Sequence, residues 1–255
     1  MWSSGGQTRS PPLTTPSEYD PRAFPPFAVT VDVAVLTVLD GRLCVLLVRR
    51  GAEPFRGMWA LPGGFKHPDE TLDEAAAREL REETGVTAVG LRQVRAYGDP
   101  GRDPRMNVVT VCYVAAVPDV GSLRAGTDAD TAQLWPIHDV LRGSSGDSDM
   151  RLAFDHEQIL RDVISLVQSE IETSPLATQF LGETFTMSEL RSAFDVVLER
   201  KHDPGNFHRR FTREPGRWLI EVGGTVTPPS GRGRPAAAYR RSSTWTTGAP
   251  GQPES

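Results

Sequence analysis

The chain has 255 residues and a formal net charge of −5, with 38% hydrophobic and 24% charged residues. This is ordinary usage for a soluble protein, and the length allows one large domain or two modest ones. No apolar run approaches the roughly 18 residues of a membrane span, so we expect no membrane partner. Residues 1–26 lack the apolar core of a secretory signal and predict a disordered leader on a cytoplasmic protein, and residues 242–255 predict a disordered tail.

The first predicted elements are two strands, residues 27–39 and 43–48, joined by a hairpin turn at Asp40-Gly41. Cys44 and Cys112 both lie within apolar, β-branched runs. We therefore expect both cysteines to be buried and unpaired, and no cluster of Cys and His has the spacing of a zinc site.

A helix is predicted from about Thr71 to Thr84, and it carries an unusual density of carboxylates. Its apolar stripe consists of Leu72, Ala75, Ala76 and Leu80. Glu79, Glu82 and Glu83 share one face that falls inside this stripe. An acidic run is ordinarily a solvated helix face, but partly buried carboxylates require a neutralising cation. Hard oxygen ligands favour Mg²⁺ or Mn²⁺.

The segment from Gly64 to Val86 resembles the motif of the Nudix hydrolases, G-x5-E-x7-R-E-U-x-E-E-x-G-U, in which U is aliphatic. Every fixed position is matched, by Gly64, Glu70, Arg78, Glu79, Leu80, Glu82, Glu83, Gly85 and Val86. The resemblance implies an enzyme-type site in which Glu79, Glu82 and Glu83 coordinate divalent cations.

The resemblance also implies roles for the residues around these ligands. Glu70 supports them from the loop and Arg78 orients the carboxylates, so both join Glu82 and Glu83 as candidate catalytic residues. Gly63 and Gly64 let the loop pass close to the phosphates, although two adjacent glycines alone more often form an ordinary turn.

Further strands are predicted at residues 90–97 and 108–117, followed by a helix at residues 156–173. The apolar residues of this helix recur at helical spacing and are Ile159, Leu160, Val163, Ile164 and Val167. These elements suit an α/β/α sandwich of the Nudix type with a mixed sheet, spanning residues 27–174.

The loop between the two strands holds Arg102 and Arg105, which flank Asp103 and Pro104. Arginines near a metal site can clamp a diphosphate in bidentate fashion, whereas the alternative is a surface turn with two solvated arginines. The loop is similar to the RDPR-containing loop of ADP-ribose-type Nudix proteins, which favours ligand contact.

The general base remains unassigned from the sequence. Asp128 and Asp130, on an expected loop, and Glu157 are candidates, but residues of this kind are more often plain solvated or capping residues. His156 either lines the pocket or caps the following helix, and we favour the cap.

Residues 175–241 are basic, with 11 Lys and Arg against 7 Asp and Glu, so this +4 segment follows a body of −9. Such asymmetry indicates nucleic acid, although it also arises by coincidence. The segment 185–190 has a capping signal before a helix whose apolar side includes Leu190, Phe194, Val197 and Leu198.

A turn at residues 203–205 then leads into a short basic helix. Phe207 and Phe211 would anchor it to the core. The residues left to face outward, toward a major groove, are Asn206, His208, Arg209 and Arg210.

A strand from Trp218 to Val222 and a basic arm from Gly231 to Arg241 complete a winged helix with a two-stranded wing. Arg232 and Arg234 would lie on the wing near phosphate or the minor groove. The alternative is a flexible basic linker.

Residues 27–241 resemble the Nudix-related transcriptional regulators of NAD metabolism, the NrtR family, in four elements. These are the RDPR loop, FTMSEL, NFHRRF and GRPAAAYR. The resemblance implies a C-terminal winged helix-turn-helix domain at residues 175–241. It further implies that ADP-ribose or a related NAD-derived nucleotide binds the Nudix domain and releases a homodimer from double-stranded DNA operators.

A second hypothesis stands beside this one. Because every Nudix position is intact, hydrolysis of ADP-ribose to AMP and ribose 5-phosphate remains open. The chain would then be a dedicated Mg²⁺-dependent pyrophosphatase, whose basic C-terminal domain serves dimerisation or RNA contact.

Overall fold

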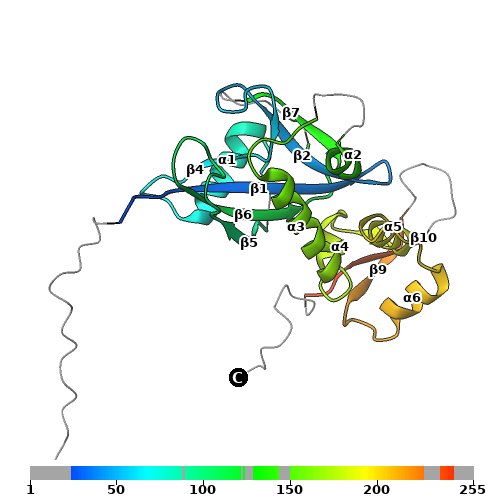
Figure 1. The fold of residues 1–255 in the computed structure, drawn as a ribbon. Helices are drawn as coiled ribbons and strands as arrows, with labels where there is room; N and C mark the ends of the chain where they lie inside the picture. Colours follow the sequence, from blue (N-terminus) through cyan, green and yellow to red (C-terminus); the bar gives the residue numbers. More distant parts are fainter. Residues whose placement is uncertain are drawn as a thin grey trace, which may run out of the picture.

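The computed structural model describes residues 24–87, 90–121, 123, 129–143, 150–226 and 236–243. An α/β body forms the larger part, and a smaller unit of helices with its own sheet follows it (Figure 1). The expected leader and tail lie almost wholly outside these residues. No helix in the described part of the chain is long and apolar enough to cross a membrane.

Seven described strands form the sheet of the body. They are β1 (Ala28–Leu39), β2 (Arg42–Arg50), β3 (Trp59–Ala60), β4 (Gly63–Phe65), β5 (Arg92–Tyr97), β6 (Val108–Ala116) and β7 (Ala129–Pro136). The order is β3-β2-β1-β6-β5, while β4 pairs with β1 and β7 pairs with β2. β1 and β6 are parallel, whereas β1 and β2 are antiparallel. The mixed sheet is therefore confirmed.

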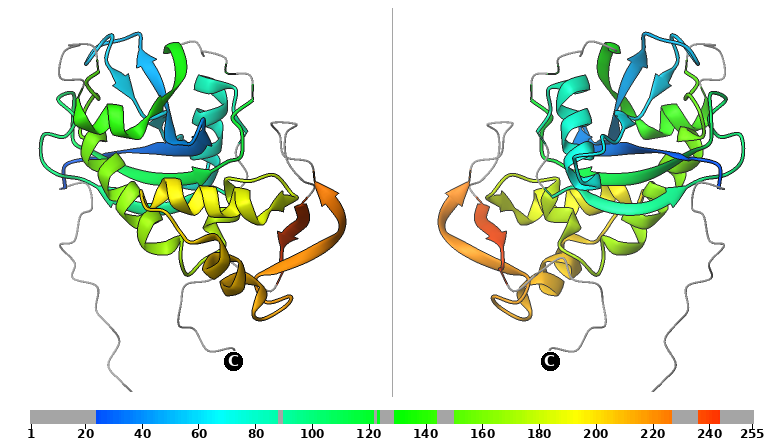
Figure 2. Two further views of the ribbon diagram at one scale, coloured as in Figure 1. Left: turned by 90° about the vertical axis from the view of Figure 1, so that its right-hand side faces the viewer. Right: turned by 90° about the vertical axis from the view of Figure 1, so that its left-hand side faces the viewer.

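Helices cover both faces of this sheet (Figures 1 and 2). They are α1 (Leu72–Thr84), α2 (Ile137–Arg142) and α3 (His156–Glu170). Side chains alternate along β1, so that Val31, Val33 and Val35 pack with α1 while Ala34 and Leu36 pack with α3. This arrangement is the predicted α/β/α sandwich.

The ends of α1 follow from local sequence chemistry. Thr71 accepts a hydrogen bond from the backbone N–H of Glu74, and the Glu74 side chain accepts one from the backbone N–H of Thr71, which forms a capping box. Gly85 ends the helix in the left-handed conformation with φ of 74°. The helix is therefore fixed at both ends, which sets the positions of the carboxylates between them.

The two cysteines are buried and unpaired, as predicted. Burial raises the pKa of the Cys112 thiol, which is fully enclosed in β6. Neither thiol is placed to act as a ligand.

The smaller unit has the elements of a winged helix. They are α4 (Leu176–Gln179), β8 (Phe185–Thr186), α5 (Met187–Val197), α6 (Pro204–Thr212), β9 (Leu219–Val226) and β10 (Ala236–Arg241). Thr186 caps α5 in a second capping box with Glu189, as the sequence predicted. The predicted two-stranded wing is the antiparallel pair β9 and β10, and the short strand β8 pairs with β10 to make a three-stranded sheet.

The core of this unit is continuous with the core of the body. Phe194 of α5 packs edge-on against Phe207 and Phe211 of α6, with ring centroids 5.2 and 5.7 Å apart. The same apolar cluster extends through Ile171 to Val167 of α3. The two halves are therefore packed directly together, with α5 beside the body (Figure 2).

Candidate functional site

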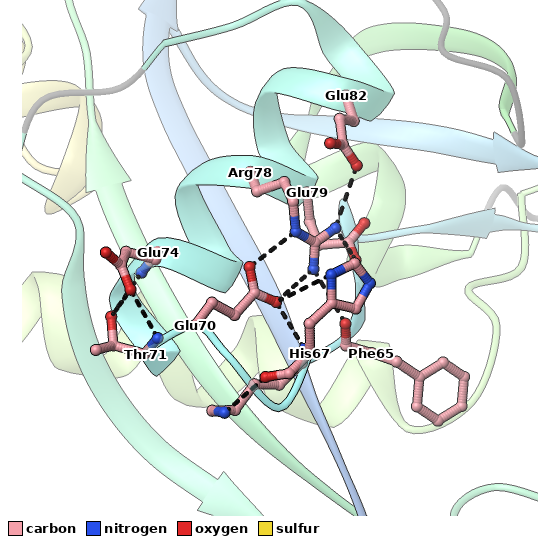
Figure 3. Close-up of polar contacts among 9 residues, drawn as sticks. Phe65, His67, Glu70, Thr71, Glu74, Arg78, Glu79 and Glu82 are labelled. Carbon is pink, nitrogen blue, oxygen red and sulfur yellow. Dashed lines mark hydrogen bonds and ion pairs between the residues drawn. The ribbon is translucent and has the colours of Figure 1, made fainter.

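Arg78 lies at the centre of a hydrogen-bond network among carboxylates (Figure 3). Its Nε and Nη2 donate to the two carboxylate oxygens of Glu70 at 2.9 and 2.7 Å. Its Nη1 donates to Glu79 at 2.8 Å and to Glu82 at 3.1 Å, while Nη2 also reaches the carbonyl oxygen of Phe65 at 3.1 Å. The bidentate pair lowers the pKa of Glu70 to about 2. One guanidinium therefore fixes three carboxylates.

The three glutamates of the motif differ in exposure. The side chain of Glu79 is 13% exposed and Glu83 is half-buried, but Glu82 is 54% exposed. The prediction that all three lean toward the packed side is wrong for Glu82. Around the helix axis, Glu83 lies at the centre of the apolar stripe, whereas Glu82 lies roughly 100° away at its edge.

Burial changes the protonation of these carboxylates. It raises the pKa of Glu83 to about 8, against a hydrogen bond that the backbone N–H of Gly63 donates to Glu83 Oε2 at 2.9 Å. Burial also raises the pKa of Glu79, although Arg78 opposes it. Negative charge on Glu79 and Glu83 is thus destabilised in the absence of a cation.

The three motif glutamates have the right ligand atoms for a hard divalent cation, but their side chains do not converge on one point. Glu79, Glu82 and Glu83 supply carboxylate oxygens, which suit Mg²⁺ or Mn²⁺. The raised pKa of Glu83 shows that its ionised form is unfavourable without a cation and would be stabilised by one. Within the described residues, however, no three acidic, His or Cys side chains converge as a ready ligand set. Arg78 holds Glu79 and Glu82, so an ion must displace part of its network.

Gly63 and Gly64 are required by close packing inside the protein. A Cβ atom on Gly63 would collide with the carbonyl oxygen of Val31, and one on Gly64 would collide with the Glu79 carboxylate. The alternative of an ordinary turn is wrong, because both residues form β4 and pair with β1. The glycines bring the strand against the carboxylates of α1.

A cleft of about 510 Å³ opens over this network. Its walls come from β1, β2, β4, α1, the loop after β5 and the start of α3. Such a volume suits a small organic ligand. All the Nudix carboxylates except Glu70 line it, together with Gly63, Gly64, Arg78, Arg102 and Arg105.

Asp32 lies in this cleft and was missed from the sequence. It is 7% exposed and accepts a hydrogen bond from Thr110 Oγ1 at 2.6 Å. Nε2 of His156 lies 3.4 Å from its other oxygen. A signal was available, since Asp32 is the one charged residue in the apolar run from Phe27 to Val38.

His156 lines the cleft, and the preference for a capping role is wrong. Its Nδ1 accepts a hydrogen bond from the backbone N–H of Leu61 at 2.9 Å, and the residue is 3% exposed. Burial lowers the pKa of His156. The N-cap of α3 is Asp155, whose side chain makes no capping hydrogen bond because Arg102 holds it instead.

The two arginines of the RDPR loop both line the cleft, each already paired. Arg102 donates to the two oxygens of Asp155 at 2.9 and 2.6 Å and is 5% exposed, so it is not a solvated surface residue. Arg105 pairs with Asp103 at 2.6 Å and is 39% exposed. A ligand would meet Arg105 more readily than Arg102.

Aromatic rings and a further arginine extend the wall. The Arg105 guanidinium lies 5.2 Å from the centre of the Phe65 ring and 5.7 Å from that of Phe154. Arg50 lies 4.8 Å from the Phe154 ring. The sequence did not single out Arg50 or Phe154, which lie about a hundred positions apart in the chain and meet only in the fold.

The structure narrows the choice of a general base. Glu157 points away from the cleft lining and pairs with Arg161 on the exposed side of α3 at 2.7 Å. The prediction that Asp130 lies on a loop is wrong, because Asp130 belongs to β7, which pairs with β2. Asp128 lies outside the described residues.

The short basic helix α6 presents polar residues to the surface. Asp203 caps it by accepting from the backbone N–H of Asn206 at 2.8 Å. Phe207 and Phe211 are buried, as expected, at 3% and 4% exposure. The exposed residues are Asn206, His208, Arg209 and Arg210, with Asn206 accepting a hydrogen bond from Arg209.

Arg210 departs from the expected outward direction. Its Nη2 donates to the carbonyl oxygen of Glu172, and its Nη1 lies 3.7 Å from the Glu172 carboxylate. The guanidinium also lies over the rings of Phe194 and Phe211. The flank of α6 that carries Arg210 faces the turn after α3. Arg232 and Arg234, expected on the wing, lie outside the described residues.

Comparisons with known proteins agree with this architecture. The NUDIX domain family model matches residues 26–162, and the NrtR DNA-binding winged helix domain model matches residues 177–241. A crystal structure of Shewanella oneidensis NrtR complexed with a 27mer DNA superposes with a TM-score of 0.70 at 33% identity, covering 84% of this chain and 93% of that one.

Two curated relatives represent the two hypotheses. The ADPR responsive transcriptional repressor NtrR of Acinetobacter baylyi is 29% identical over 196 residues, 76% of each chain. The ADP-ribose pyrophosphatase of Methanocaldococcus jannaschii is 37% identical over 130 residues, 51% of this chain and 71% of that protein. The pyrophosphatase match is thus limited to about half of this chain, whereas the regulators match across both parts. This chain belongs to the Nudix family and, within it, to the NrtR-type members that carry a DNA-binding winged helix.

Proposed function

We propose that this protein is a transcriptional repressor of NAD metabolism genes that binds double-stranded DNA as a cytoplasmic homodimer and responds to ADP-ribose or a related nucleotide. One observation carries the proposal. A cleft of ligand size, lined by the Nudix carboxylates, is packed in one chain against a winged helix with an exposed basic helix. The boundary between the two functional halves is placed near residue 174.

DNA contact is assigned to α6 and the wing. Asn206, His208 and Arg209 lie exposed on α6, where amide and guanidinium groups can read base edges or hold phosphates. Arg232 and Arg234 are assigned to the neighbouring backbone or minor groove. Their positive charge supports binding that weakens as salt rises.

Ligand contact is assigned to the cleft. Arg105, with Arg50 behind it, supplies positive charge for a diphosphate, and the exposed ring of Phe65 offers a surface for a planar base. Gly63 and Gly64 in β4 carry no side chains, which leaves room for the phosphates to approach the carboxylates of α1. Arg102 fixes the cleft wall through Asp155.

Divalent metal is assigned to Glu79, Glu82 and Glu83, with Mg²⁺ or Mn²⁺ as the ion. When bound, such an ion polarises the diphosphate and lowers the pKa of a coordinated water. Glu70 acts through Arg78, which holds Glu79 and Glu82 in reach of the cleft. The intact motif supports slow hydrolysis of ADP-ribose to AMP and ribose 5-phosphate as a second activity.

The regulatory logic is thermodynamic linkage. A ligand shifts the DNA-bound population only by its difference in affinity for the DNA-bound and free conformations. Gln168 of α3 donates to the carbonyl oxygen of Val197 in α5, and α3, α5 and α6 share one apolar cluster through which that difference can act.

The test is DNA binding by the purified full chain. Fluorescence anisotropy of a labelled fragment from upstream of its own gene cluster measures the binding. We expect binding at low salt that weakens severalfold when ADP-ribose is added. Absence of any binding preference over an unrelated fragment of equal length would end the repressor proposal.

Hydrolysis is tested separately by following AMP release from ADP-ribose with Mg²⁺. We expect Glu82→Gln to lower turnover, while Glu157→Gln, a carboxylate outside the cleft, leaves turnover unchanged. Equal turnover by wild type and Glu82→Gln would remove Glu82 from the metal site.

A further inference from the structure

Helix α3 joins the ligand cleft to the DNA-binding unit. Its 15 residues span about 22 Å. At its start, Asp155 is held by Arg102, and His156 is held by the backbone N–H of Leu61 in the cleft. Two side chains at the start of α3, Asp155 and His156, are therefore bonded to residues that line the cleft.

The other end of α3 contacts the winged helix by several independent bonds. Gln168 Nε2 donates to the carbonyl oxygen of Val197, the last residue of α5, at 3.0 Å. Ile171 is fully buried in the shared core. Beyond it, the Glu172 carboxylate pairs with Arg200, which lies between α5 and α6.

Glu172 also holds a residue of the DNA-reading helix. Its carbonyl oxygen accepts a hydrogen bond from Arg210, and its carboxylate lies 3.7 Å from Arg210 Nη1. The Arg210 guanidinium lies over the rings of Phe194 and Phe211, with distances of 5.7 and 5.4 Å to their centres. The side chain is nevertheless 41% exposed, so solvent and an approaching phosphate can reach it.

We propose that Glu172 is a positioning residue that couples the ligand cleft to DNA binding, by competing with DNA phosphate for the guanidinium of Arg210. This inference rests on the proposed function. When Glu172 contacts Arg210, α6 is bonded to the turn after α3, and the Arg210 guanidinium is not available to a DNA phosphate. Ligand in the cleft favours the held arrangement, and DNA favours the released one.

The chemistry of the pair supports competition. The Glu172 carboxylate lies 3.7 Å from Arg210 Nη1 without a hydrogen bond, and the same N–H donors that face it can bind a DNA phosphate, so phosphate can replace this loose contact. The Glu172–Arg210 pair is also solvent-accessible, and pairs of this exposure are weak enough to exchange. A fully buried pair would be costly to break and would stay formed when DNA binds.

The experiment measures the affinity of the full chain for its operator with and without the α,β-methylene analogue of ADP-ribose, which is not hydrolysed. The ratio of the two dissociation constants reports coupling, commonly about 5- to 150-fold. In Glu172→Gln we expect this ratio to fall by up to about fivefold, as for loss of one exposed ion pair. Operator binding without ligand should tighten, because Arg210 loses the attraction of the Glu172 carboxylate and keeps only its bond to the backbone carbonyl oxygen.

Three further measurements separate coupling from general damage. Binding of the analogue to the DNA-bound chain, measured by calorimetry, should be unchanged in Glu172→Gln, because Arg210 is already released there. The matched control Glu157→Gln breaks the exposed Glu157–Arg161 pair on the same helix and should keep the wild-type ratio. In Arg210→Gln the ratio should fall, and adding Glu172→Gln to it should have no further effect.

The outcomes are distinguishable. If the wild type does not bind DNA or does not respond to the analogue, the proposed function fails and this inference with it. If the wild type responds and Glu172→Gln responds equally, only the role of Glu172 is overturned. Additive effects of Glu172→Gln and Arg210→Gln would likewise overturn it, even where one variant is less stable.

Discussion

His156 and Asp32 meet at the floor of the cleft, where Nε2 of the histidine lies 3.4 Å from a carboxylate oxygen of the aspartate. The other ring nitrogen, Nδ1, accepts the backbone N–H of Leu61, so the ring is fixed on both sides. The cleft thus has a floor that joins β1, the loop before β4 and the first residue of α3.

This relationship predicts how stability depends on pH. Burial lowers the pKa of His156 below its ordinary value of 6.5, so the unfolded chain takes up the proton at a higher pH than the folded one. The stability conferred by the neutral ring is present above pH 6.5 and is lost as pH falls below it. Glu83, whose pKa is raised to about 8, contributes the opposite slope in this window, so the decline due to His156 should be measured as the difference in the free energy of unfolding between the wild type and a variant without the ring, by chemical denaturation from pH 8 to pH 5.

The matching variant is His156→Ala, which removes the acceptor of the Leu61 N–H. We expect it to lower the free energy of unfolding at pH 8 by about 1–3 kcal/mol and by less at pH 5, because the variant has no buried ring to protonate. His138→Ala, at an exposed position of α2, should keep the wild-type pH profile. A wild-type slope retained in His156→Ala would show that another group titrates.

Gly64→Ala should damage the site more than the fold. The new Cβ collides with the Glu79 carboxylate, whose side chain must move from its bond with Arg78. We expect loss of ligand affinity by at least about tenfold, comparable to disturbing a residue that supports a metal ligand. Calorimetric titration with ADP-ribose and Mg²⁺ measures it.

Gly182→Ala is the matched control, because its Cβ would make only an ordinary contact with the Thr184 carbonyl oxygen at 3.8 Å. Ligand affinity there should equal that of the wild type. Equal affinity of Gly64→Ala and Gly182→Ala would place the ligand away from this strand.

Arg78→Lys should separate charge from geometry. Lysine keeps the positive charge but cannot donate in bidentate fashion to Glu70 while also holding Glu79 and Glu82. We expect about 10- to 100-fold weaker metal-dependent ligand binding, with thermal stability nearly retained. Electron paramagnetic resonance can measure Mn²⁺ affinity by titration in the presence of ligand. An Mn²⁺ affinity equal to that of the wild type would contradict the prediction.

Arg209→Ala should weaken operator binding. Arg209 is exposed on α6 and donates to Asn206 of the same helix, whereas Arg210 donates to Glu172 outside the helix. A lost base contact costs about 1–3 kcal/mol, whereas a lost phosphate contact lowers the slope of log K against log salt by about 0.9. Anisotropy at several salt concentrations distinguishes the two, and Arg161→Ala on α3 is the control.

Much of the site followed from short-range patterns. The Nudix motif located α1 and its carboxylates, because helix phase depends on neighbours within a few residues. FTMSEL located the start of α5 for the same reason. Phe207 and Phe211, four residues apart, correctly indicated the buried side of α6.

The missed features are contacts between distant segments. Leu61 and His156 are 95 positions apart, and no local pattern indicates that a backbone N–H needs that particular ring. The capture of Arg102 by Asp155 spans 53 positions. The contact between Glu172 and Arg210 depends on how the winged helix packs against the body. Hydrophobic periodicity in the sequence does not specify that packing. Asp32 is different, since its charge within a buried strand was visible in the sequence.

Arg78 gives the ligand-free protein an internal cation among its carboxylates. A free metal ion entering alone must break the bonds of Arg78 to Glu79 and Glu82, and it gains little that the guanidinium did not already provide. A metal ion that arrives with a diphosphate brings additional oxygen ligands and a negative charge that the displaced guanidinium can meet. We therefore expect the protein to be indifferent to fluctuations in cellular Mg²⁺ and to register only the metal–nucleotide complex.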